Sequence, residues 1–157
     1  MQSQELNRQH QKIQHLISSV RSIPAEQSEL QAHWARYICV LSAGFIENAL
    51  SDVYTRYVKG CANEAVANFS SSKLNRIQNP KSNRFVETAR SFKINWGEEL
   101  NTFLDDNGRG DAINGIMSNR HLIAHGNNSG ISLVRVTEYL SKSVEVIEYI
   151  EGQCGLD

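Results

Sequence analysis

The feature that most constrains the fold is a long stretch of helix-favouring sequence between Pro24 and Gly60. The chain has only two prolines, Pro24 and Pro80, so a residue that breaks helices is absent from this stretch. Apolar residues recur at helical spacing on two neighbouring faces, which is typical of a helix buried on both sides. The first face carries Trp34, Ile38, Leu41, Phe45, Ala49 and Val53, and the second carries Tyr37, Val40, Gly44, Glu47, Tyr54 and Val58.

The remaining chain also shows mostly helical periodicity. We expect further helices at residues 3–21, 81–94, 97–104, 111–125 and 137–152, with a short helical continuation at 61–69. Residues 131–136 are expected to form a brief extended segment before the last helix. The sequence therefore predicts an all-α fold, an up-and-down bundle of about five helices. At 157 residues the chain has the length of a single domain, 1–157.

The composition is that of an ordinary globular protein. Apolar residues make up 40% of the chain and charged residues 21%, which does not favour a disordered or fibrous chain. The polar N-terminus lacks a signal-peptide core, and no apolar run is long enough to cross a membrane. Three scattered cysteines, Cys39, Cys61 and Cys154, show no zinc-binding spacing. We therefore expect a cytoplasmic protein with no membrane partner.

Positive charge is concentrated in one part of a nearly neutral chain. The formal net charge is -1, which argues against a non-specific nucleic-acid coat. In the basic segment, residues 73–93, only Glu87 opposes the positive charges. Such a segment is either a solvated helix face or a phosphate-binding patch. Its cations are Lys73, Arg76, Lys81, Arg84, Arg90 and Lys93.

The residues with the most chemical potential lie at the end of the helix predicted at 111–125. The sequence there is Asn119-Arg120-His121-Leu122-Ile123-Ala124-His125-Gly126. Arginine presents a planar cationic fork that suits phosphate, and histidine transfers protons near neutral pH. Together these side chains could cleave a phosphodiester without a metal.

Each of these residues also has a structural interpretation. Arg120 shares a face with apolar residues, so it could form a buried ion pair with Glu47, which interrupts an apolar stripe. His125 could be a simple capping residue ahead of Gly126. His121 and His125 are one helical turn apart, but no third ligand is evident, so we expect neither a metal nor a cofactor.

Two segments resemble the HEPN superfamily, in particular its RiboL-PSP and MAE-type branches. One is Arg120-His121-x-x-Ala124-His125-Gly126, and the other is the acidic position in Phe45-Ile46-Glu47-Asn48-Ala49-Leu50. The resemblance spans about residues 25–152. It implies a metal-independent endoribonuclease with Arg120, His125 and His121 as catalytic residues, supported by Glu47 and Asn119. His121 departs from the Asn that is common at this position.

The resemblance also implies partners. RNA would be the substrate. The excess of positive charge in the basic segment, and not the resemblance, predicts that its six cations contact this RNA away from the cleavage site. Two copies would form a homodimer in which the motifs of both copies, residues 120–126, line one cleft. A toxin or defence role with a cognate antitoxin protein would follow. The alternative is a non-catalytic HEPN-like module that binds RNA or a protein, and a weaker one is a purely structural helical subunit.

Overall fold

The computed structural model describes residue 1 and residues 3–156. These residues form seven α-helices and two 3₁₀ helices, Ala25–Gln27 and Asp106–Gly108. The prediction of an all-α bundle is confirmed, and the helix count slightly exceeds the expected number of about five. The α-helices are α1 (Gln4–Arg21), α2 (Ser28–Cys61), α3 (Glu64–Leu74), α4 (Ser82–Phe92), α5 (Ile94–Asp105), α6 (Arg109–Ala124) and α7 (Leu133–Gln153).

The expected extended segment at residues 131–136 is wrong. Ser132 accepts a hydrogen bond from the Arg135 N–H and caps α7, which begins at Leu133. An N-cap serine satisfies an amide that the first helical turn leaves unpaired. Val134 and Val136 therefore belong to the first turn of a helix, and Ile131 lies before its cap. Among the described residues no strand is formed.

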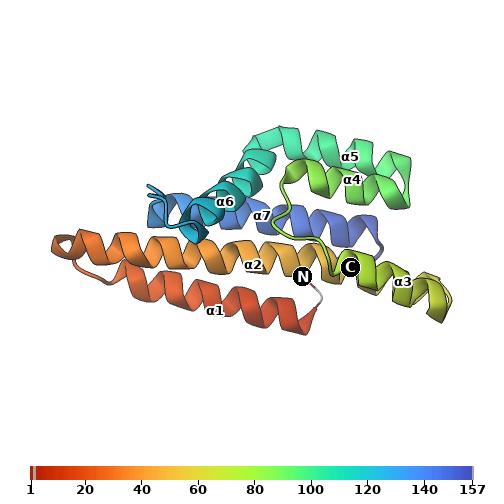
Figure 1. Cartoon of the computed structure of the whole chain (residues 1–157), viewed down its shortest axis with the longest axis horizontal. Helices are drawn as coiled ribbons and strands as arrows, with labels where there is room; N and C mark the ends of the chain where they lie inside the picture. Colours follow the sequence, from red (N-terminus) through yellow and green to blue (C-terminus); the bar gives the residue numbers. More distant parts are fainter. Residues whose placement is uncertain (2, 157) are drawn as a thin grey trace.

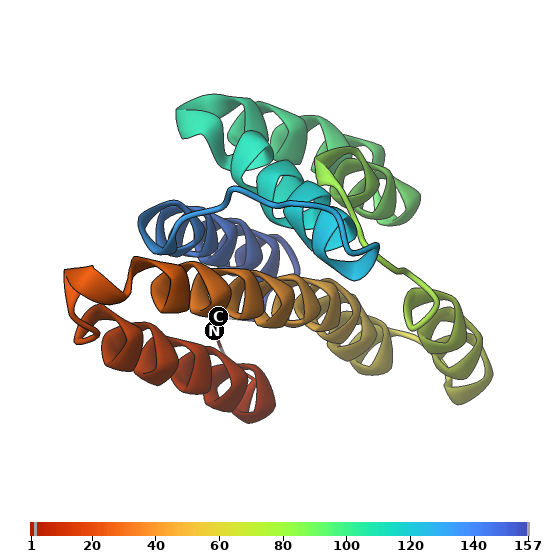
Figure 2. The ribbon, with the colours of Figure 1, turned by 60° about the vertical axis from the view of Figure 1, so that its left-hand side comes forward.

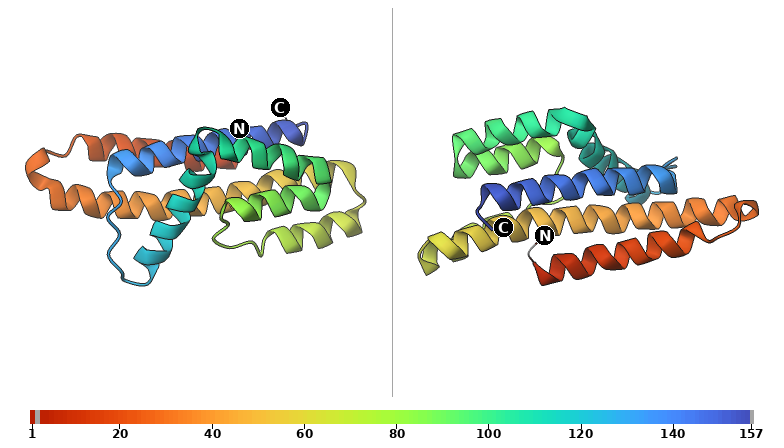
Figure 3. Two further views of the ribbon diagram at one scale, coloured as in Figure 1. Left: turned by 90° about the horizontal axis from the view of Figure 1, so that it is seen from above. Right: turned by 180° about the vertical axis from the view of Figure 1, so that it is seen from behind.

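Helix α2 is the axis of the molecule. It has 34 residues, and Figure 1 shows it running through the molecule with α1 and α7 on either side. The α4–α5 hairpin forms the edge opposite α1 (Figure 2). Helix α6 departs from the up-and-down pattern, because it crosses α2 steeply and its C-terminal end projects to one side (Figure 3, left). In the described part of the chain, no helix is both long and apolar enough to cross a membrane.

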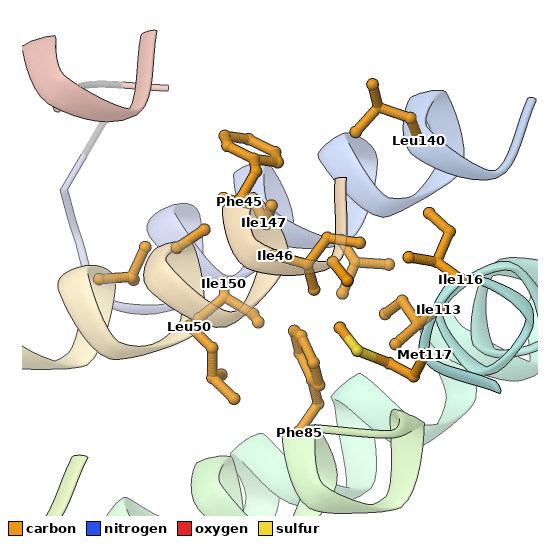
Figure 4. Packing of buried hydrophobic residues seen from close by; sticks show 14 of the residues in the cluster. Phe45, Ile46, Leu50, Phe85, Ile113, Ile116, Met117, Leu140, Ile147 and Ile150 are labelled. Atoms are coloured by element: carbon orange, nitrogen blue, oxygen red, sulfur yellow. The ribbon is translucent and has the colours of Figure 1, made fainter. Parts of the chain in front are cut away.

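The core lies where α2, α4, α6 and α7 meet (Figure 4). The side chains there are almost completely buried, so their apolar surface is removed from water and stabilises this crossing. Three of them precede Arg120 on α6, which fixes that helix before the motif begins. The labelled residues are Phe45, Ile46, Leu50, Phe85, Ile113, Ile116, Met117, Leu140, Ile147 and Ile150.

The crossing of α6 and α7 is tightest at Gly115. A Cβ atom at this position would overlap the ring of Tyr139 on α7, whereas a Cβ atom at Gly44 on α2 would meet no atom within 4 Å. Both glycines lie inside helices. Alanine substitutions at these two positions therefore separate the effect of packing from the effect of helix propensity.

We expect Gly115→Ala to lower the free energy of unfolding by about 1–2 kcal/mol. Overpacking costs about 1–3 kcal/mol, and the better helix propensity of alanine returns up to about 1 kcal/mol. The matched control Gly44→Ala should raise stability by up to about 1 kcal/mol. Urea denaturation measures both. Equal shifts in the two variants would show that Tyr139 does not limit the approach of α6.

Candidate functional site

The N-terminal end of α6 is anchored by Arg109. Its guanidinium donates to Asp106 Oδ2 at 2.8 Å and to Glu145 Oε2 on α7 at 2.7 Å. It also lies over the ring of Phe103, 4.1 Å from the centroid. The hydrogen bonds to Asp106 and Glu145 raise the pKa of Arg109 above its ordinary value. These contacts fix the beginning of α6.

The C-terminal end of α6 is a Schellman motif. The Asn127 N–H donates to Leu122 O at 2.9 Å, and the Gly126 N–H donates to Ile123 O at 3.1 Å. Gly126 has a φ of 69°, which glycine adopts without the penalty that a side chain brings. The helix therefore stops at Ala124, and His125 occupies the C-cap position.

The two histidines of the motif lie together on the surface. Their ring centroids are 4.4 Å apart, and both residues are exposed. Both rings are therefore accessible to a ligand from solvent. Across the described chain, no group of three or more His, Cys, Asp and Glu side chains is arranged to hold a metal ion.

Arg120 is half-buried, and no described residue forms a hydrogen bond or ion pair with its guanidinium. A free cation in a partly desolvated position keeps its full capacity for an anionic ligand. It makes no direct polar contact with His125 among the described residues. The motif thus presents a cation and two imidazoles as separate groups around the end of α6.

The expected pairing of Glu47 with Arg120 is wrong. The Glu47 carboxylate on α2 instead accepts a hydrogen bond from the backbone N–H of Asn79, in the α3–α4 loop. Asn79 has a φ of 49° and precedes Pro80, so this strained loop needs an acceptor for its amide. Glu47 therefore holds a loop, and it leaves Arg120 without a counter-charge.

Asn119 ties the motif to the loop that follows it. Its side chain donates to Gly115 O at 2.8 Å and accepts from Ser129 Oγ at 2.8 Å. Ser129 is buried, so this bond closes the loop of residues 125–130 against α6. The supporting role of Asn119 in catalysis stays a prediction, and the structure shows its hydrogen bonds to the backbone and to the loop.

Arg36 on α2 is a residue near the motif that sequence reasoning missed. Its Nε donates to Ser129 O at 3.3 Å, and its Nη1 lies 3.3 Å from His33 Nδ1. Together with Ile123 and Gly126 it lines a cavity of about 340 Å³. The sequence carries one signal for it, because Arg36 is the sole charged residue between positions 34 and 46.

The basic segment is divided among three places. Lys73 on α3 and Arg84 on α4 line one cavity, whereas Arg76 and Lys81 are exposed in the connection between these helices. Arg90 packs against Gly97, and the Lys93 ammonium lies 4.2 Å from the centroid of the Trp96 ring. The fold therefore brings only part of the segment to one site.

We expect Ser129→Ala to lower the free energy of unfolding by about 1–3 kcal/mol, because it leaves Asn119 Oδ1 without its buried donor. The midpoint of urea denaturation measures the loss. Ser18 on α1 is exposed and donates only to the carbonyl of Gln14, so Ser18→Ala is the control and should be neutral. A Ser129→Ala protein as stable as this control would show that the bond does not hold the loop.

One comparison with known proteins identifies a family. The chain matches the family described as RiboL-PSP-HEPN over residues 4–155, so the likeness extends through α1 and beyond the residues 25–152 inferred from the sequence. No curated protein and no solved structure matches the chain. The family match covers nearly the whole chain and includes the motif at the end of α6. The protein therefore belongs to the RiboL-PSP-HEPN family, a family of HEPN-type domains.

Proposed function

We propose that this protein is a metal-independent endoribonuclease. The observation that carries the proposal is the half-buried Arg120 without a counter-charge, one residue before the exposed His121 and His125 pair. A phosphodiester supplies the anion that Arg120 lacks, and imidazoles supply proton transfer at neutral pH. Family membership supports the same chemistry.

In the proposed reaction, the 2′-hydroxyl of RNA attacks the adjacent phosphorus. His125 accepts the 2′-hydroxyl proton, a proton is returned to the leaving 5′-oxygen, and His121 orients the phosphate or provides that second proton. Arg120 offsets the charge that develops on the phosphoryl oxygens. The bond between phosphorus and the 5′-oxygen breaks, which leaves a 2′,3′-cyclic phosphate and a 5′-hydroxyl.

The residues around the motif hold it in position and do not take part in breaking the phosphodiester bond. Asn119, Ser129 and Arg36 form a chain of hydrogen bonds from α6 through the loop to α2. Because this chain joins the end of α6 to the central helix, it restrains the loop that follows His125. A restrained site costs less to organise when substrate binds.

A toxin or defence role in the cytoplasm, with a cognate antitoxin protein, stays a prediction that rests on the resemblance. So does the non-catalytic alternative, a module that binds RNA or a protein. One observation distinguishes the endoribonuclease from the binding module, because only the enzyme creates new ends in the RNA that it binds.

We expect the purified protein to cleave mixed RNA in EDTA and to produce 2′,3′-cyclic phosphate ends. His125→Ala should lower the rate about 10²–10⁴-fold, the range for loss of a general acid or base, and Arg120→Ala should be comparably damaging. His15→Ala and Arg8→Ala, exposed positions on α1, are the matched controls. End-group analysis of the fragments is the measurement.

Full activity in the His125→Ala protein would remove the catalytic assignment and favour the binding module. Cleavage that is lost in EDTA and restored by zinc or manganese would instead favour a metal site at His121 and His125. His121→Ala tests that second outcome directly, because it removes one of the two ring nitrogens that a metal would use.

We also expect a symmetric homodimer in which each cleavage site uses residues of both copies. On an ideal helix Arg120 and His125 point about 140° apart, and the end of α6 projects from the molecule (Figure 3, left). Mixing inactive Arg120→Ala protein with inactive His125→Ala protein should then restore activity, because a mixed dimer contains one intact site. Sedimentation should show a dimer at micromolar concentration. An active monomer, or a mixture that stays inactive, would contradict a shared site.

A further inference from the structure

A second place on the surface combines an exposed aromatic ring with two cations. A cavity of about 280 Å³ lies between α3 and α4, just below the usual size range for small-ligand sites. Its aromatic and basic lining residues are Phe69 and Lys73 from α3 and Arg84 and Phe92 from α4. The two helices are joined by the loop that Glu47 holds.

Phe69 is unusually accessible for its type. Its side chain is 65% exposed, and the Lys73 ammonium lies 5.4 Å from its ring centroid. An isolated exposed phenylalanine needs no explanation, and Phe69 and Lys73 are one turn apart on α3. Arg84, however, reaches the same cavity from a different helix. Two helices thus supply a ring and two cations to one concave surface.

The charge of this cavity favours an anionic ligand. None of its lining residues is acidic, and Lys73 forms no ion pair with a described carboxylate. Arg84 Nη1 lies 3.3 Å from Glu87 Oε2, and both of these side chains are more than half exposed. Such a pair contributes little and is easily exchanged for a phosphate. The cavity therefore offers a flat apolar ring beside cations, which is the combination that recognises single-stranded nucleic acid.

We propose that this cavity binds one nucleotide of single-stranded RNA outside the cleavage motif. Phe69 stacks on the base, and Lys73 and Arg84 bind the adjacent phosphates. The proposal deepens the ribonuclease function and rests on it for the identity of the ligand. Because stacking on a ring tolerates every base, this site contributes affinity and position with little sequence preference.

The cavity and the motif at the end of α6 are placed so that one continuous RNA strand could contact both. Helix α3 and the C-terminal end of α6 project from the same side of α2 (Figure 3, left). Arg36 on α2 bonds the loop after α6, and Ser51 on α2 bonds Asn75 at the end of α3. Fifteen residues separate these two points, about 22 Å along α2. A strand held at the cavity would therefore have to extend for several nucleotides to reach His125.

Binding of a strand that cannot be cleaved tests the proposal without relying on catalysis. The probe is a fluorescent 2′-O-methyl single strand of about 12 nucleotides, and the readout is fluorescence anisotropy over a range of salt concentrations. Phe69→Ala should weaken binding about 5- to 150-fold, the effect of losing one stacked base, with an unchanged salt slope. Phe69→Trp should retain binding. Lys73→Gln should flatten the log–log salt slope by about 0.7.

Two controls match these variants. Ile94→Ala removes an apolar side chain that is 70% exposed on α5, and Lys12→Gln removes an exposed cation on α1; neither should affect binding. A Phe69→Ala protein that binds like Ile94→Ala, or a native protein that does not bind the strand, would overturn the proposal. If the native protein cleaves RNA but Phe69→Ala leaves strand binding unchanged, the proposal for this cavity is rejected and the ribonuclease proposal is not. If Phe69→Ala weakens strand binding but the native protein does not cleave ordinary RNA, the ribonuclease proposal is rejected and the proposal for this cavity is not.

Discussion

Burial of α2 on two sides is the constraint on which the rest of the structure depends. The helix has 34 residues, and its apolar side chains pack against α1, α3, α6 and α7. An isolated helix is marginal in water, so its stability comes from that packing. An ion pair also joins α2 to α7, because the half-buried Arg56 on α2 bonds the buried Glu151 on α7 at 2.7 Å.

The fold class could be predicted because its signals are local and repeated. Trp34, Ile38, Phe45 and Val53 recur at helical spacing, and such a pattern has few alternatives over so long a stretch. Helix boundaries were harder to predict. The β-branched residues after Gly130 resemble a strand until Ser132 is recognised as a cap, and that role depends on a hydrogen bond to Arg135. The position of the motif at a helix end was predictable, because Gly126 marks it.

The partners of charged residues could not be predicted in the same way. Glu47 and Arg120 both interrupt apolar faces, and each is a reasonable partner for the other in sequence. The partner of Glu47 proved to be a backbone amide at Asn79, whose need for an acceptor depends on a positive φ before Pro80. Arg36 was missed for a related reason, since its acceptor is the carbonyl of Ser129, 93 residues away. Side-chain identity does not report which backbone groups the fold leaves unpaired.

The distribution of charge also depends on the fold more than on the sequence. Six cations lie close together in the basic segment, but the turn of α4 into α5 sends Arg90 and Lys93 toward Gly97 and Trp96. Lys73 and Arg84 remain with Phe69. A protein with a formal net charge of -1 thus has a local positive surface without being basic overall. Such a surface attracts phosphates over short range, within a screening length of about 8–10 Å.

The C-terminal end of α6 is stabilised less by apolar burial than the core of the molecule is. His121, Leu122, Ala124 and His125 are exposed, so little apolar burial opposes fraying there, and the closing bonds of Gly126 and Asn127 lie near solvent. Segments of this kind open locally at a fraction of the global unfolding free energy. Amide hydrogens at this end would exchange with solvent while those of Ile113 and Ile116 stay protected. A contact with RNA or with a second copy would slow that exchange, so the amides of residues 121–127 would also report whether this surface is occupied.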